Sequence, residues 1–129
     1  MREILFRGKR VAGGKEWIYG NVNYYPNINR WFIRLHPAMN VMQTLEDEVS
    51  AKTVGQFTGL LDKNGKKIFE GDIVKHRSYY SGNFIISVVT YTEGYFLAMA
   101  DNNSGFNLSD KLEVIGNIHD NPELLKGGE

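Results

Sequence analysis

The chain has 129 residues, of which 42% are hydrophobic and 23% are charged, and its formal net charge is zero. This composition excludes a disordered or fibrous protein and is typical of one globular domain. The absence of cysteine excludes disulfides, iron–sulfur clusters and thiolate zinc sites, and no apolar run is long enough for a signal peptide or a membrane span. We therefore expect a single domain, in the reducing cytoplasm, with no membrane partner.

The first 50 residues alternate short apolar runs with turn residues, which predicts a meander of β-strands. The runs EILFRGK, EWIYGNVNYY and RWFIRL are separated by Gly13-Gly14 and by Pro26-Asn27. Trp17 and Trp31 each stand two residues before another bulky side chain, so each pair shares one face of its strand. Residues 38–49 show no clear helical stripe and give no definite prediction.

The chain from about residue 51 to residue 129 predicts a small closed or half-closed β-barrel. Asn64-Gly65 predicts a tight hairpin turn, and FIISVVTYT, almost all β-branched or aromatic, predicts a central strand. Asp120-Asn121-Pro122 predicts the start of a short C-terminal helix. The residues expected in the core, taken from the apolar strand patterns, are Trp17, Trp31, Phe57, Ile73, Val88 and Ile115.

Patterns that resemble catalytic or metal-binding motifs do not have the required spacing. The segment 59–66 is one residue too long for a phosphate-binding loop, and Lys67 stands where Ser or Thr is needed. The loop 101–107 lacks the glycine of a calcium loop, and the histidines are far apart in the sequence. The sequence therefore predicts no catalytic residue, no metal ligand and no cofactor.

Charge is distributed unevenly along the chain. Residues 1–34 carry a net charge of +5 and residues 93–129 a net charge of −5. The two ends can attract each other within one fold, or the basic end, with its interleaved aromatic residues, can bind phosphates and stack on bases. The residues that would then contact nucleic acid are Arg7, Lys9, Arg10, Lys15, Lys66 and Lys67.

Three blocks of the sequence resemble one known family. They are FRGKRV with Trp17 and Gly20, TVGQFTGLLDKNGKKIFEGDIV at 53–74, and LEVIGNIHDNPELL at 112–125. They are similar to the YopX family, small proteins encoded by phages and prophages, and the likeness covers most of the chain. The resemblance implies an SH3-like small β-barrel, here with an added N-terminal β-meander, and a place in the cytoplasm of a bacterial host. It implies no reaction and no catalytic residue.

We expect a non-catalytic binding or assembly protein, because strands that can expose sheet edges occur without a chemical motif. Adjacent Tyr79 and Tyr80 predict either an exposed aromatic loop that contacts a protein partner or a second copy, or a loop folded over the end of the barrel. Nucleic acid is the alternative partner. A third alternative, a metal-dependent hydrolase or nuclease, would need Asp62, Glu70 and Asp72 to converge, although Gly-Asp before an apolar pair also marks the entry to a strand.

Overall fold

A computed structural model describes residues 3–13, 15–35, 46–78, 81–100 and 105–125. The structure is mainly β, as predicted. Within these ranges the helices are the short 3-10 turns η1 (Ala51–Thr53) and η2 (Pro122–Leu125), and no helix is long and apolar enough to cross a membrane. The strands are β1 (Phe6–Lys9), β2 (Trp17–Tyr25), β3 (Arg30–Leu35), β4 (Glu46–Val49), β5 (Gly55–Leu61), β6 (Lys67–Phe69), β7 (Asp72–Arg77), β8 (Phe84–Thr92), β9 (Tyr95–Ala100), β10 (Gly105–Asn107) and β11 (Glu113–Asn117).

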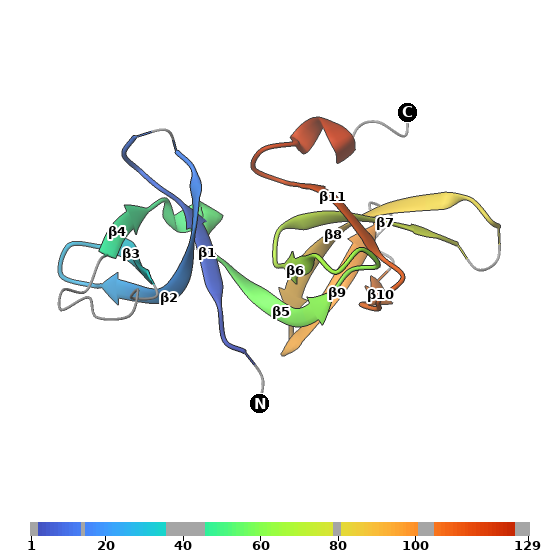
Figure 1. The fold of residues 1–129 in the computed structure, drawn as a ribbon, viewed down its shortest axis with the longest axis horizontal. Helices are drawn as coiled ribbons and strands as arrows, with labels where there is room; N and C mark the ends of the chain where they lie inside the picture. The colour runs from blue at the N-terminus through green and yellow to red at the C-terminus, as the bar shows by residue number, and fades with distance from the viewer. Residues whose placement is uncertain (1–2, 14, 36–45, 79–80, 101–104, 126–129) are drawn as a thin grey trace. The chain divides into compact units, whose positions relative to one another are not determined.

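The strands form two antiparallel sheets, ordered β4-β3-β2-β1-β5-β6 and β10-β9-β8-β7-β11 (Figure 1). The chain divides into two compact units, residues 1–57 and 58–129, and β5 contributes residues to both. Neither sheet closes into a barrel in the described ranges, so the barrel predicted for residues 51–129 is not confirmed as a closed structure. The strands β6 and β10, each at one end of its own sheet, have only three residues.

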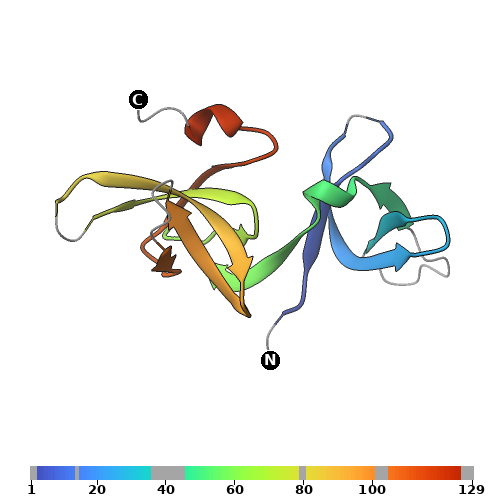
Figure 2. The same ribbon diagram turned by 180° about the vertical axis from the view of Figure 1, so that it is seen from behind.

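The first unit is a strongly curled meander (Figure 2). β1 and β4 lie three places apart in the sheet order, yet Arg10, the residue after β1, forms an isolated bridge with Val49 of β4. Gly20 permits this curl, because a Cβ atom there would lie only 2.0 Å from the carbonyl oxygen of Arg34 on the neighbouring strand. The concave side holds the buried side chains of Ile33 and Val49.

The second unit has one core, on the inner face of its five-stranded sheet. The core consists of Ile68, Val74, Val89, Ala98 and Leu112. β8 pairs with β7 on one side and β9 on the other, so the prediction of FIISVVTYT as a central strand is confirmed. The turn at Asn64-Gly65 and the helical turn that begins at Pro122 are confirmed too.

The predicted core is confirmed in part. Phe57 and Ile73 are buried. The other four residues, Trp17, Trp31, Val88 and Ile115, are only half-buried. Alternation along a strand shows which residues share a face but not which face is covered. Ile115 has a second reason, because it falls at a β-bulge between Val114 and Gly116, where the alternation is interrupted.

Candidate binding surfaces

The convex side of the first unit carries aromatic and charged side chains. We call it the first outer face, and it is formed by residues that alternate with the buried Ile33 and Val49. Its members on the four strands are Arg7, Lys9, Trp17, Tyr19, Tyr25, Arg30, Phe32, Arg34, Glu46 and Glu48.

Two of the predicted nucleic-acid contacts, Arg7 and Lys9, lie on this face beside Trp17. The Arg7 guanidinium stands 4.5 Å from the centre of the Trp17 ring system, and the Lys9 ammonium 5.7 Å from it. Arg7 is only 6% exposed. The guanidinium is therefore largely removed from water, and a cation–π contact contributes more as the cation loses water.

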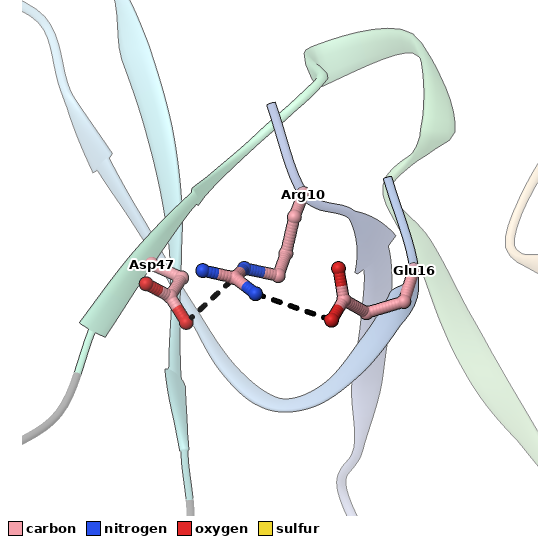
Figure 3. A network of polar contacts seen from close by, with 3 residues as sticks. All are labelled: Arg10, Glu16 and Asp47. Carbon is pink, nitrogen blue, oxygen red and sulfur yellow. Dashed lines mark hydrogen bonds and ion pairs between the residues drawn. The ribbon is translucent and has the colours of Figure 1, made fainter. Parts of the chain in front are cut away.

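Arg10, another predicted contact, is held by two carboxylates. Its Nη1 donates to Glu16 Oε2 at 3.2 Å, and its Nε lies 3.5 Å from Asp47 Oδ2 (Figure 3). A backbone hydrogen bond and the Arg10 charge lower the pKa of Glu16, although burial opposes them. Lys15 is exposed and has a left-handed backbone, with φ of 59°.

The acidic residues of β4 neutralise other charges on the first outer face. Arg30 donates from Nε and Nη2 to both carboxylate oxygens of Glu48, at 2.8 and 2.7 Å. Glu46 accepts hydrogen bonds from the Tyr25 hydroxyl at 2.8 Å and from Asn23 at 3.0 Å. The bond to Glu46 raises the pKa of Tyr25. The face is therefore mixed in charge rather than uniformly basic.

The remaining predicted contacts, Lys66 and Lys67, are exposed in the second unit, on the hairpin that Asp62 organises. Asp62 is 4% exposed and accepts backbone N–H groups of Asn64, Lys66 and Val114 at 2.8, 2.9 and 3.0 Å. Burial raises the pKa of Asp62, but these donors and the Lys66 charge outweigh it, and the pKa is lowered. The role of these six cations in nucleic-acid binding stays a prediction.

Two of the three carboxylates that a hydrolase would need, Asp62 and Asp72, have structural contacts. Asp62 joins its hairpin to β11, and Asp72, which is buried, accepts the Phe69 N–H at 2.8 Å. No group of three potential metal-ligating side chains occurs in the part of the chain that the structure describes. These contacts support the local bonding role of the Gly-Asp pair. Tyr79 and Tyr80, the predicted interaction residues, lie outside the described residues.

A second surface, which the sequence did not predict, lies on the side of the five-stranded sheet opposite the core. We call it the second outer face. Its residues alternate with the core residues Val74, Val89 and Ala98, and its centre is apolar and half-buried. The signal was present in FIISVVTYT, where apolar residues occur at both odd and even positions, a pattern typical of strands with protein contacts on both faces. Its central members are Ile86, Val88, Leu97 and Met99.

Comparison with known proteins gives a family and three matching chains among the solved structures. One of these, the crystal structure of protein EF1440 from Enterococcus faecalis, shares 28% sequence identity with the chain, covers 97% of this chain and 99% of its own, and has a TM-score of 0.55. A search of curated proteins finds no match. The family model described as YopX protein matches residues 6–126, which is nearly the whole sequence. The chain therefore belongs to the YopX family.

Proposed function

We propose that this protein is a non-catalytic binding or assembly protein of phage or prophage origin that associates with itself. One observation carries the proposal: ionisable groups suited to chemistry or phosphate binding are engaged in structural contacts, whereas large apolar side chains are exposed. Asp62, Asp72 and Arg10 illustrate the first half. Phe84, 56% exposed, and Tyr95, 68% exposed, illustrate the second. Exposed aromatic side chains are typical contact residues.

Sedimentation velocity over a concentration series from low micromolar to submillimolar tests self-association. We expect the weight-average sedimentation coefficient to rise with concentration and to return to the monomer value on dilution, because a reversible oligomer obeys mass action. A clean monomer at every concentration would overturn the proposal.

We also propose, within this function, that the second unit is the SH3-like region that the family resemblance implies, as a half-open barrel. In support, Ile68 of β6 shares one core with Val74, Val89 and Ala98 of the five-stranded sheet. The hairpin of β5 and β6 thus supplies one core residue from outside that sheet. An experimental structure superposed on SH3-like barrels tests this assignment.

Nucleic-acid binding is the second candidate function, and the partly exposed Lys9 beside the Trp17 ring on the first outer face favours it. Fluorescence anisotropy with single- and double-stranded oligonucleotides in a salt series tests it. Binding through several phosphates would weaken steeply as salt rises, and charge reversal at Lys9 and Lys15 would flatten the slope. An absence of binding in low salt would eliminate this candidate.

A further inference from the structure

We propose that the second outer face is the surface through which two copies of the chain form a dimer, with their β8 strands antiparallel across a two-fold axis. This inference rests on the self-association proposed above. It adds the interface, the partner and the symmetry.

At one side of the second outer face, the sheet is covered by η2 of the same unit. A Cβ atom at Gly116, on β11, would lie 2.9 Å from the Leu124 side chain, so η2 packs over that strand (Figure 1). Ile73, which pairs with Gly116, is fully buried. Further across the sheet, Val88 and Met99 are paired with each other and remain partly exposed. The apolar centre on β8 and β9 is therefore where another protein surface can add burial.

One end of this face is basic and aromatic, and the carboxylate that lies there, Glu113 beside Lys75, forms an ion pair with Lys63 at 3.5 Å. Lys75 and Arg77 on β7 point to the same side as Phe84 on β8, because Arg77 and Phe84 are paired in register. The Lys75 Nζ lies 4.6 Å and the Arg77 Cζ 4.7 Å from the centre of the Phe84 ring. More than half of Phe84 is nevertheless exposed.

The opposite end is acidic and aromatic. Glu93 and Gly94 form the two-residue turn between β8 and β9, with φ of 53° and 88°, as a type I′ hairpin turn requires. Glu93 is exposed, and beside it Tyr95 presents the most exposed aromatic ring of the described residues. The two ends thus carry opposite charge, and each has an aromatic side chain ready for a contact.

This arrangement is self-complementary only in one orientation. A two-fold axis that crosses the strands near Val88, the middle residue of β8, reverses the strand direction of the second copy. The basic end of each copy then faces the acidic end of the other, and the contact occurs twice. A two-fold axis parallel to the strands would instead place the two basic ends together and the two acidic ends together. Charge complementarity therefore selects the antiparallel pair.

The size of the face predicts a weak dimer. Three strands span about 14 Å and the nine residues of β8 about 30 Å, a flat area of about 400 Å². Stable interfaces bury about 800 Å² of accessible surface per partner, so this one lies at the small end. We expect association at micromolar rather than nanomolar concentration.

Charge reversal in separate copies provides the test. In a Glu93→Lys dimer both contacts would join two basic side chains, and in an Arg77→Glu dimer both would join two acidic side chains. Each variant alone should therefore raise the dimer dissociation constant at least tenfold. An equimolar mixture should restore near-wild-type association, because in the mixed dimer both contacts again join a basic and an acidic side chain. One contact joins the two substituted side chains, and the other joins the native Arg77 and Glu93. A folding defect in one variant could not be repaired in this way. Asp110→Lys, the same charge change at an exposed site outside the face, is the matched control.

A second variant tests the axis directly. The chain has no cysteine, so Val88→Cys introduces a single thiol beside the expected axis, and mild oxidation should give a disulfide-linked dimer. Lys111→Cys, exposed and outside the face, should remain monomeric. If the wild type associates but the charge variants associate equally well, this interface is wrong while the proposed function stands. If the wild type is a monomer throughout, both are wrong.

Discussion

Replacing Asp62 with asparagine should destabilise the protein far more than its small change in size suggests. The carboxylate accepts N–H groups of Asn64 and Lys66 on one oxygen and that of Val114 on the other. In Asp62→Asn, when the amide oxygen of the new side chain keeps the two hairpin bonds, the NH₂ group of the same side chain lies against the Val114 N–H. That unpaired donor costs about 1–3 kcal/mol, and loss of charge weakens the other two bonds, so we expect about 2–4 kcal/mol in all.

Urea unfolding at neutral pH measures this loss as a lower midpoint with an unchanged slope. Asp110→Asn, which alters an exposed carboxylate, is the control and should fall within about 0.5 kcal/mol of the wild type. The pKa of Asp62 is lowered from 3.8, so its stabilising effect is present above that value and is lost as the pH falls through the lower, folded-state pKa. The difference between wild type and Asp62→Asn should therefore shrink in acid. A neutral-pH loss no larger than that of the control would refute the assigned role.

Three further predictions concern single side chains. Burial lowers the pKa of His76 from 6.5, so the unfolded chain binds a proton at a higher pH than the folded chain does. The free energy of unfolding should therefore fall as the pH drops below 6.5. Urea unfolding at several pH values should show that His76→Phe loses this pH dependence. Gly20→Ala should cost more than about 3 kcal/mol or prevent folding, because the added Cβ atom would clash with the Arg34 carbonyl. At Gly65 the backbone φ is 84° but the space around the Cβ position is open, so Gly65→Ala should cost about 1 kcal/mol in thermal unfolding. Arg10→Met should cost less than about 1 kcal/mol, and salt should reduce the difference, because both ion pairs are partly exposed.

The elements that sequence patterns predicted well are those specified by neighbouring residues. The Asn64-Gly65 turn needs only a residue that accepts positive φ, and the run 84–92 is β-branched or aromatic at most positions. β4 was not predicted, since its sequence EDEV carries three acids and no alternation. It is a strand because it pairs with β3 and because its carboxylates meet Arg10 and Arg30, which lie far away in the sequence.

The candidate surfaces were harder to predict than the strands for the same reason. The sequence alone indicates that Arg7 and Arg10 are cations available to a ligand, but folding places one against Trp17 and the other between Glu16 and Asp47. Val88 was expected in the core because it is apolar. Alternation places Val88 and Val89 on opposite faces, but only the register with β7 and β9 shows that Val88 lies beside Ile73 and Met99. Partners across a sheet depend on register, which a local pattern does not contain.

The pairing of β11 with β7 has a consequence for protein synthesis. β7 to β10 are joined by consecutive hairpins, so each strand can pair soon after it leaves the ribosome, whereas β7 must wait for β11 to complete its other edge. At about 5–20 residues per second the nascent chain exposes that edge for a few seconds, during which it can pair with the wrong strand. Lys75 and Arg77 on β7 can act as gatekeepers in this interval, because two like charges discourage β7 of one nascent chain from pairing with β7 of another.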